Sequence, residues 1–365
     1  MVQTIYMFKH KPDAVLIIII AVLIVFGLIM LSSASSVIAY SQYGSSYYFF
    51  THQLSRLVLG LIIFWFFFQK DYRCWKKYSI WFLIGSIALL ILVFIPGLGS
   101  AHGKSQSWID IGYSLQPSEL VKLSFLFYLS AWLANRKAKL DKISQGIGPF
   151  IAVLIAIAFL MLLQPDLGTL SIITLTALIV YFVGGGKIWH LFVITIIGAL
   201  LFSAVILSNE YQLNRFKCVF NSDSDSCYQI NQSLIAVGSG GLFGRGFGQS
   251  RQKFMYLPEV SGDSIFAIIG EELGLIAGSL LIMTYILLFY RGILIAKRAP
   301  DDFGRILAIG ISSWIIVQVI INIGGMINLI PMTGVPLPFI SYGGSALVSV
   351  LAAMGVLANI SKARA

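Results

Sequence analysis

The chain alternates long apolar runs with short polar segments. Ten of these runs approach the ~20 residues that a helix needs to cross a ~30 Å hydrocarbon core. They cover residues 14–33, 52–69, 77–97, 118–134, 147–163, 167–184, 188–208, 264–290, 304–330 and 341–360. Such runs are too long for barrel strands, and a helix satisfies its own backbone hydrogen bonds in lipid. The pattern therefore predicts an all-α polytopic membrane protein with ten transmembrane helices.

One long polar segment lies between the seventh and eighth predicted helices. Residues 209–263 concentrate Gly, Arg, Lys, Asp and Gln in a chain that is otherwise apolar. No linker, low-complexity tract or repeat divides the sequence, so residues 1–365 are expected to form a single membrane domain with this segment as its only large loop. Because the polar residues gather there, the chemistry is expected in or beside it.

Composition supports the membrane prediction. Hydrophobic residues make up 58% of the chain and charged residues 11%, and the mean hydropathy is +0.88. Soluble domains carry about 25% charged residues. The first apolar run, residues 14–31, is longer than the roughly 7 to 15 residues of a secretory signal. It is therefore expected to remain as the first helix.

Positive charge predicts the orientation. With the N-terminus inside, most Lys and Arg residues outside the 209–263 segment fall on one side of the membrane, among them Lys70, Arg73, Lys187 and Arg298. The positive-inside rule then places both termini in the cytoplasm and the large loop on the extracytoplasmic face. The net charge of +10 is thus a topology signal and argues against a nucleic-acid partner. Most carboxylates fall on the outer face.

Asp263 closes the polar segment directly before an apolar helix. If that helix continues at about 100° per residue, Glu271 lies ~80° around it and ~12 Å deeper, and Glu272 lies on the opposite side. Only Asp263 would then be accessible at the membrane interface. Two interpretations stay open: a helix N-cap, or a general base that acts on a lipid headgroup.

Glu119 and Lys122 lie three residues apart at the start of another apolar helix. This spacing places both side chains on one helix face, where they can form an internal ion pair. Ionisable residues at membrane depth also mark polar cavities. The alternative is therefore a cavity that this pair shares with Asp263.

The large loop carries cations on the face that should hold few, including Arg215, Arg245 and Lys253. Six glycines between positions 238 and 248 accompany them, without the spacing of a nucleotide-binding loop. One interpretation is a flexible, turn-rich loop. The other is that glycine lets backbone N–H groups and these cations approach an anionic headgroup.

The remaining polar positions have simpler explanations. Asp166 and the pair Ser341 and Tyr342 lie in outer turns whose Pro and Gly residues account for them. The histidines are scattered, so nothing indicates zinc, haem or a Ser-His-Asp triad. Cys218 and Cys227 share the outer loop, where either a disulfide or two free thiols fits, and only a structural role is expected.

Seven separated motifs stand at the predicted helix ends. In chain order they are Trp108-Ile109, Gln116-Pro117-Ser118-Glu119 with Lys122, Gln164 to Thr169, Gly238 to Gly241, Leu257-Pro258-Glu259 before Asp263, Glu271 to Gly274, and Pro338 to Ser345. Their order resembles that of the SEDS family, named for shape, elongation, division and sporulation. Residues 248–259 and 269–275 are more similar to the division branch, FtsW, than to the elongation branch, RodA.

The resemblance implies a peptidoglycan glycosyltransferase of the bacterial cytoplasmic membrane, acting at the division septum. Such enzymes polymerise lipid II, a disaccharide-pentapeptide on undecaprenyl pyrophosphate, into β-1,4 glycan strands at the outer face of the membrane. The implied partners are a class B penicillin-binding transpeptidase and other division proteins. A lipid II flippase or transporter, and a noncatalytic division scaffold, remain as alternatives.

The resemblance aligns the family's essential aspartate with Asp263, which implies a general base. Its surroundings depart from the family pattern: Ser261-Gly262-Asp263-Ser264 replaces His-Thr-Asp-Phe, and Ser107 replaces a common arginine. Cations expected at the pyrophosphate are Lys122, Arg215, Arg245 and Lys253. Further expected substrate contacts are Trp108, Gln116, Glu119, Asp166, Glu259, Ser341 and Tyr342. No metal ligand is assigned, and assistance from a divalent cation, Mg or Mn, stays open.

Overall fold

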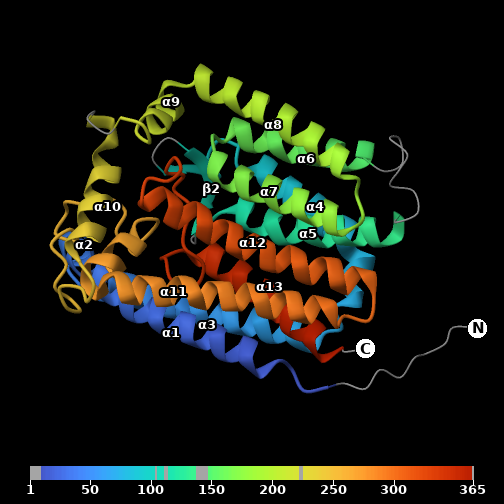
Figure 1. The fold of residues 1–365 in the computed structure, drawn as a ribbon, viewed down its shortest axis with the longest axis horizontal. Coiled ribbons are helices and arrows are strands. Elements are labelled where there is room, and N and C mark those ends of the chain that lie inside the picture. The colour runs from blue at the N-terminus through green and yellow to red at the C-terminus, as the bar shows by residue number, and fades with distance from the viewer. Residues whose placement is uncertain (1–9, 103–104, 111–113, 137–146, 222–224, 364–365) are drawn as a thin grey trace, which may run out of the picture.

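Long helices lie side by side in a bundle, with short helices and loops gathered at one end (Figure 1). The computed structural model describes residues 10–102, 105–110, 114–136, 147–221 and 225–363. Within this part, seven helices are long and apolar enough to cross a membrane. They are α1 Ala14–Ala34, α3 Tyr48–Gln69, α4 Arg73–Leu92, α8 Ile188–Ser208, α11 Ile265–Lys297, α12 Asp302–Met326 and α13 Gly344–Lys362.

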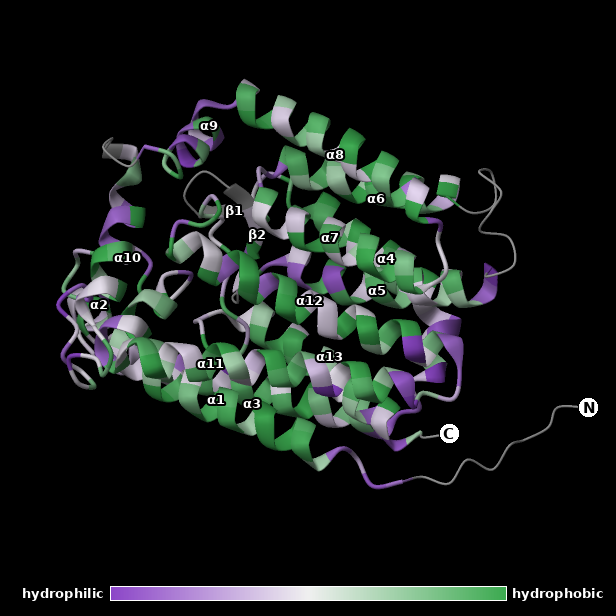
Figure 2. Ribbon diagram, in the orientation of Figure 1, coloured by the Kyte–Doolittle hydropathy of each residue, from purple (hydrophilic) through white to green (hydrophobic). Residues whose placement is uncertain are grey.

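The other three predicted segments are also helical. They form α5 Pro117–Arg136, α6 Ile147–Leu163 and α7 Leu167–Val183, and the last two are shorter, with 17 residues each. Every apolar run of the sequence therefore coincides with a helix. Figure 2 shows the basis of this agreement between the apolar runs and the helices. Apolar residues cover the length of the bundle, and hydrophilic residues gather at its two ends.

Two expectations about the polar regions are wrong. The protein is not purely α-helical, because β1 Gly99–His102, β2 Ser105–Asp110 and β3 Ser114–Leu115 form a small antiparallel sheet between α4 and α5. The 209–263 segment is also not the only large excursion, and it is itself folded into α9 Glu210–Lys217, a 3-10 turn η2 Asp225–Cys227 and α10 Tyr228–Ser239. Short polar elements of this kind lack the long periodicity that sequence patterns reveal. A further short helix, α2 Ser36–Tyr43, follows α1.

The centre of the bundle is formed by α12 and α13, most of whose residues are buried. At the opposite extreme, α8 has no buried residue and lies at the margin of the bundle (Figure 1). Its apolar side chains are therefore left for lipid. The backbone N–H of His10 donates to the carbonyl of Lys362 at 3.1 Å, so the two described chain ends lie at the same end of the bundle.

Gly274 breaks α11 into two helices, with φ 77° and ψ −177°. A Cβ at this position would lie 2.3 Å from the backbone nitrogen of Gly244, so only glycine fits the conformation and the close approach. The second helix begins at the loop, because the N–H of Leu275 donates to the carbonyl of Gly241 at 2.9 Å. The expectation of one continuous helix over residues 264–290 is therefore wrong, although the break lies beyond Glu271 and Glu272 and leaves their helical spacing from Asp263 unchanged.

Candidate active site

A cavity of about 1070 Å³ lies where the sheet, α9 and the loops before α11 and α13 converge. It is lined from β2, the start of α7, α9, residues 259–263 and the 330–336 loop. Seven residues expected from the sequence to contact substrate or act in catalysis line it together. They are Trp108, Gln116, Asp166, Arg215, Glu259, Asp263 and Tyr342.

Asp263 lies in this cavity with 9% of its surface exposed, so it is nearly buried yet reachable. Its backbone carbonyl accepts from Nδ2 of Asn322 at 2.8 Å, and its Oδ1 accepts from the Ser264 hydroxyl at 3.4 Å. The N-cap of α11 is Ser264, which makes no side-chain cap hydrogen bond. The interpretation of Asp263 as a helix cap is therefore wrong, and its carboxylate faces the cavity instead.

The surroundings of Asp263 favour a proton acceptor that works near neutral pH. Burial, and next the negative charge of Glu259, raise the pKa of Asp263 to about 7, while Arg215 and the Ser264 hydroxyl act in the opposite direction. A general base is most effective when its pKa lies near the working pH. Perturbed carboxyl groups in clefts are typical of functional sites.

Arg215 extends from α9 into the cavity. Its Nη1 donates to the carbonyl of Met332 at 3.2 Å, and its guanidinium lies 4.6 Å from the ring centre of Tyr211. Among the lining residues in the described part of the chain, it is the only lysine or arginine. Positive charge for an anionic ligand in this cavity is therefore concentrated in one side chain.

A tight turn holds Glu259 next to Asp263. The carbonyl of Glu259 accepts from the N–H groups of Gly262 and Ser264, and Glu259 itself has a φ of 51°. The Ser341 hydroxyl donates to the carbonyl of Gly262 at 2.6 Å. Ser341 does not line the cavity, so its observed contact holds the turn; a direct substrate contact is not supported by this position.

Tyr342 and Asp166 both line the cavity and form hydrogen bonds that hold neighbouring backbone in place. The N–H of Tyr342 donates to the carbonyl of Ser261 at 2.8 Å, and its ring lies in the cavity wall. Asp166 caps α7 by accepting from the N–H of Thr169 at 3.0 Å, as turn chemistry predicts, and it also lines the cavity.

Glu119 and Lys122 lie outside the cavity. Lys122 Nζ donates to Glu119 Oε1 at 2.8 Å and to Gln318 Oε1 at 2.9 Å, and it lies 5.0 Å from the ring centre of Trp314. Both charged side chains are at most 2% exposed. The ion-pair interpretation is confirmed, and the expectation of a cavity shared with Asp263 is wrong because the pair turns toward α12.

Lys253 also lies outside the cavity. Its Nζ donates to Glu272 Oε1 at 3.0 Å, to the Ser33 hydroxyl at 3.2 Å and to the Gly248 carbonyl at 2.7 Å. With its proton donors occupied inside the protein, it is not placed to contact a pyrophosphate in this cavity. Arg245 is likewise absent from the residues that line the cavity.

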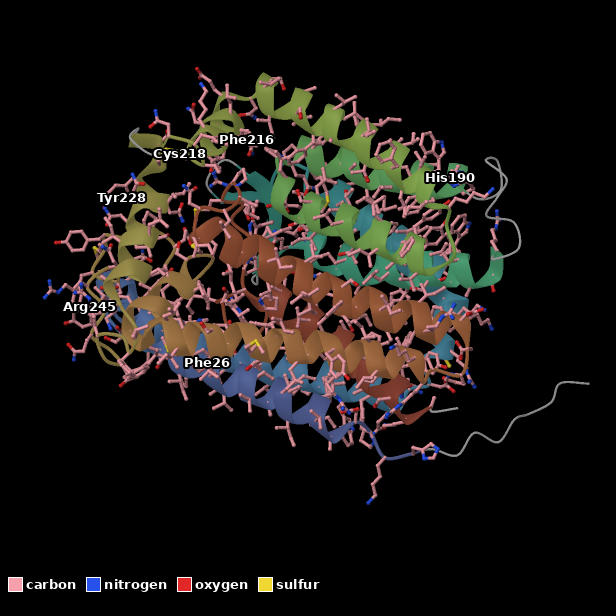
Figure 3. The ribbon with its side chains drawn as sticks, viewed as in Figure 1. Phe26, His190, Phe216, Cys218, Tyr228 and Arg245 are labelled. Carbon is pink, nitrogen blue, oxygen red and sulfur yellow. A yellow bond between two sulfur atoms is a disulfide. The ribbon has the colours of Figure 1, made fainter. Side chains whose placement is uncertain are left out.

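Arg245 lies at the outer edge of the glycine-rich loop (Figure 3). Its Nε donates to the Ser239 carbonyl at 3.2 Å and lies 3.8 Å from Glu271 Oε1. Glu271 in turn accepts from the N–H of Arg251 at 2.9 Å and from the Ser250 hydroxyl. Buried carboxylates thus organise this loop, which favours the structural interpretation of its glycines and cations over a headgroup cradle.

Two parts of the site carry no clear signal in the sequence. Residues 330–336 contribute much of the lining, yet they read only as a Pro- and Gly-containing turn. Asn322 holds the Asp263 backbone and the Val335 carbonyl from within the apolar helix α12. A buried amide among apolar residues was the available signal, because such groups require hydrogen-bond partners.

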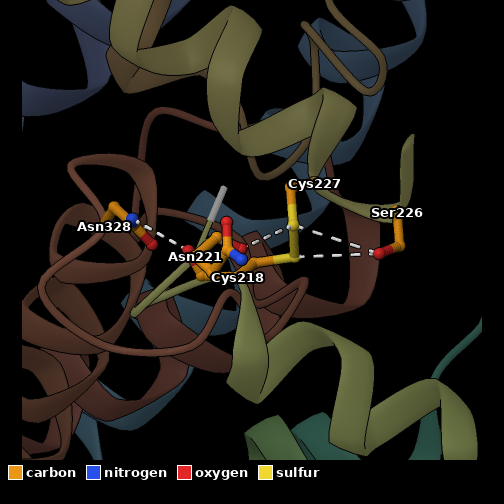
Figure 4. The surroundings of a disulfide bond; sticks show 5 residues. All are labelled: Cys218, Asn221, Ser226, Cys227 and Asn328. Carbon is orange, nitrogen blue, oxygen red and sulfur yellow. Dashed lines mark hydrogen bonds between the residues drawn. A yellow bond between two sulfur atoms is a disulfide. The ribbon is translucent and has the colours of Figure 1, made fainter. Parts of the chain in front are cut away.

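The structure resolves the alternatives for the two outer cysteines. Cys218 and Cys227 form a disulfide, with a Cα–Cα distance of 5.5 Å, and Asn221, Ser226 and Asn328 surround it (Figure 4). Cys74 is a free, exposed thiol. No group of three or more His, Cys, Asp or Glu side chains with metal-binding geometry occurs among the described residues.

Residues 13–365 match the model of the FtsW/RodA/SpoVE family of cell cycle proteins. The chain belongs to this family. The SEDS resemblance drawn from the seven motifs is thereby confirmed.

Curated relatives match the chain over nearly its full length. Stage V sporulation protein E of Bacillus subtilis is 42% identical, covering 97% of this chain and 98% of the relative. The probable peptidoglycan glycosyltransferase FtsW of Coxiella burnetii is 40% identical, covering 96% of each chain. The FtsW of Bacillus subtilis, which has the same description, is 40% identical and covers 96% of this chain and 90% of the relative.

Solved structures share the fold. A chain of a peptidoglycan synthase complex superposes with a TM-score of 0.79 at 24% identity, covering 96% of this chain and 97% of the other. The rod shape determining protein RodA of Thermus thermophilus superposes with a TM-score of 0.73 at 25% identity, covering 97% of each chain. The bundle thus has a RodA-like membrane fold.

Proposed function

We propose that this protein is a peptidoglycan glycosyltransferase that polymerises lipid II, with Asp263 as general base. The observation that carries the proposal is a reachable carboxyl group with a pKa of about 7, in a cavity with a single lining cation among the described residues. The relatives named peptidoglycan glycosyltransferase support the same reaction class.

The reaction requires one proton acceptor and one site of positive charge. The donor sugar is α-linked to pyrophosphate and the product is β-1,4-linked, so one displacement inverts C1. The acceptor 4-hydroxyl passes its proton to an oxygen of Asp263 as its oxygen bonds to C1. The bond between C1 and the pyrophosphate oxygen breaks, and its electron pair leaves with the pyrophosphate. Arg215 stabilises the charge that develops there.

Other lining residues have supporting roles in this proposal. Glu259 raises the basicity of Asp263, and Trp108, Gln116 and Tyr342 form walls that orient the sugars. Glu119, Lys122, Arg245, Lys253 and Ser341 act on the framework, because they lie outside the cavity. Mg²⁺ or Mn²⁺ would find oxygen donors in the carboxylates that line the cavity, Asp166 and Glu259 among them, since such ions bind one or two carboxylates together with substrate phosphates. A bound ion would add positive charge at the pyrophosphate.

We place the protein in the bacterial cytoplasmic membrane as one domain of ten transmembrane helices, with both termini in the cytoplasm and the 209–263 segment outside. The adjacent chain ends and the basic residues near that end of the bundle support this orientation. A class B penicillin-binding transpeptidase and other division proteins at the septum are the partners we propose. The likeness to a chain of a peptidoglycan synthase complex supports such an assembly.

Purified protein in liposomes with fluorescent lipid II tests the activity against the alternatives. A polymerase forms glycan strands that a muramidase digests, with or without stimulation by a partner transpeptidase. A flippase moves lipid II between leaflets without forming strands, and a scaffold does neither. The Cys74→Ser variant serves as a matched control, because Cys74 is exposed on α4, away from the cavity-lining residues. Transport without polymer would refute the proposal.

A further inference from the structure

The helix that carries Arg215 is unusually short and exposed for a residue on which a reaction depends. It lies on α9, a helix of eight residues, none of which is buried. Helices this short are marginal on their own. Contacts outside α9 must therefore fix the position of Arg215 relative to Asp263.

The disulfide lies at the point where α9 meets the rest of the protein. Cys218 is the C-cap of α9, three residues after Arg215, and Cys227 is the N-cap of α10. Both cysteines are at most 1% exposed. The Cys218 carbonyl also accepts from Asn328 Nδ2 at 3.2 Å (Figure 4). The bond thus ties the end of the exposed helix to a buried anchor.

From Cys227 the connection continues to the general base. Gln229, two residues further on, donates from Nε2 to the Ser264 hydroxyl at 3.1 Å. That hydroxyl donates to Asp263 Oδ1 at 3.4 Å. On the far side, α10 is fixed to the bundle, because Ser233 donates to Met326 Sδ at 3.6 Å and packs in the buried interior. Figure 3 shows Phe216, Cys218 and Tyr228 following one another along this connection.

We infer that the Cys218–Cys227 disulfide is a positioning element of the active site, which holds Arg215 at a fixed distance from Asp263. This inference rests on the proposed function and adds a redox requirement to it. A dithiol reductant would convert the bond to two thiols and be oxidised to its own cyclic disulfide. Arg215 would then keep its non-covalent contacts, which are the hydrogen bond to Met332, the Tyr211 ring and, through Cys218, the hydrogen bond from Asn328, but α9 would lose its covalent tie to α10. Polymerisation would then slow while the bundle stays folded.

The experiment uses the full-length protein in detergent or liposomes with lipid II. The Cys74→Ser variant, which leaves only the disulfide cysteines, is assayed before reduction, after reduction with dithiothreitol, and after reoxidation with oxidised glutathione. We expect kcat to fall about tenfold on reduction and to recover on reoxidation, since small misplacements of catalytic groups carry such costs. The Cys218→Ser/Cys227→Ser variant should have, before any treatment, the same rate as the protein with its disulfide reduced. Dithiothreitol should not change that rate.

Two readouts separate positioning from general stability. In an Arg215→Ala background, breaking the disulfide should not lower the polymerisation rate further, because the disulfide acts on the rate through Arg215. Arg215 and Glu259 are the charged groups that act on Asp263, and Ser264 is its hydrogen-bond donor. Displacing Arg215 should therefore move the acidic limb of the rate profile to higher pH. Wild-type activity and an unchanged profile in the double serine variant would overturn the inference. If the unreduced wild type forms no glycan, the proposed function itself fails.

Discussion

Two substitutions of opposite charge should shift the pH dependence of polymerisation in opposite directions. Glu259 raises the pKa of Asp263 and Arg215 lowers it, around a value of about 7. Glu259→Gln keeps the shape of the side chain and removes its negative charge, so Asp263 becomes a weaker base and ionises at lower pH. Arg215→Gln removes the positive charge, so Asp263 ionises only at higher pH.

The size of the effect follows from the ionisation of Asp263. With a pKa of about 7, about one-tenth of the molecules carry the ionised base at pH 6 and about nine-tenths at pH 8. Wild-type kcat/KM should therefore rise about tenfold between pH 5 and pH 6 and then level off above pH 7. Arg215→Gln should also lower the plateau about 100-fold, because it removes the charge that faces the leaving group.

The assay is the initial rate of glycan formation from lipid II, measured between pH 5 and pH 9 with a buffer series of constant ionic strength. Cys74→Ser again gives the reference profile. The reasoning is refuted if both substitutions move the acidic limb in the same direction, or if neither moves it.

Further predictions concern stability and local structure. Asp263→Asn should stabilise the protein at pH 8 by up to about 4 kcal/mol but hardly at pH 3, because a carboxyl group whose pKa is raised from 3.8 to about 7 costs stability progressively as pH rises between those two values; melting temperatures at both pH values check the sign. Lys122→Met should destabilise by about 3 to 5 kcal/mol, since it leaves Glu119 buried without its partner, and Glu119→Gln in the same chain should restore much of the loss in thermal melts. Gly274→Ala should lower the melting temperature by placing a Cβ against Gly244; an unchanged melting curve would contradict the close approach.

The sequence predicted the helices well because each apolar run carries its own signal. The run at 188–208 coincides with α8, which has no buried residue, since lipid imposes the apolar pattern without any tertiary contact. The small sheet at 99–115 carried no such signal. Its strands are two to six residues long and depend on pairing with one another.

The site was predictable in its residue types and less so in its geometry. Asp263, Glu259 and Arg215 meet in the cavity as their polar character within an apolar chain indicated. Lys122 and Lys253 were expected there and are instead buried against Glu119 and Glu272. Sequence spacing cannot distinguish a cation that faces a ligand from one that neutralises a neighbouring carboxylate, because tertiary packing decides between them.

The same limit explains the error about the helix after Asp263. The apolar run 264–290 was expected to form one helix, and one glycine in the left-handed region interrupts it at position 274, beyond Glu271 and Glu272. The sequence contained that glycine, but the loop backbone that demands it came from more than twenty residues upstream.

The role of Asp263 is tested most directly by polymerisation of lipid II with purified wild-type protein and the Asp263→Asn variant at pH 8. The account predicts long glycan strands from the wild type and none from the variant, although the variant keeps its fold and its melting temperature is no lower. Strands of wild-type length and rate from Asp263→Asn would contradict a general base at this position.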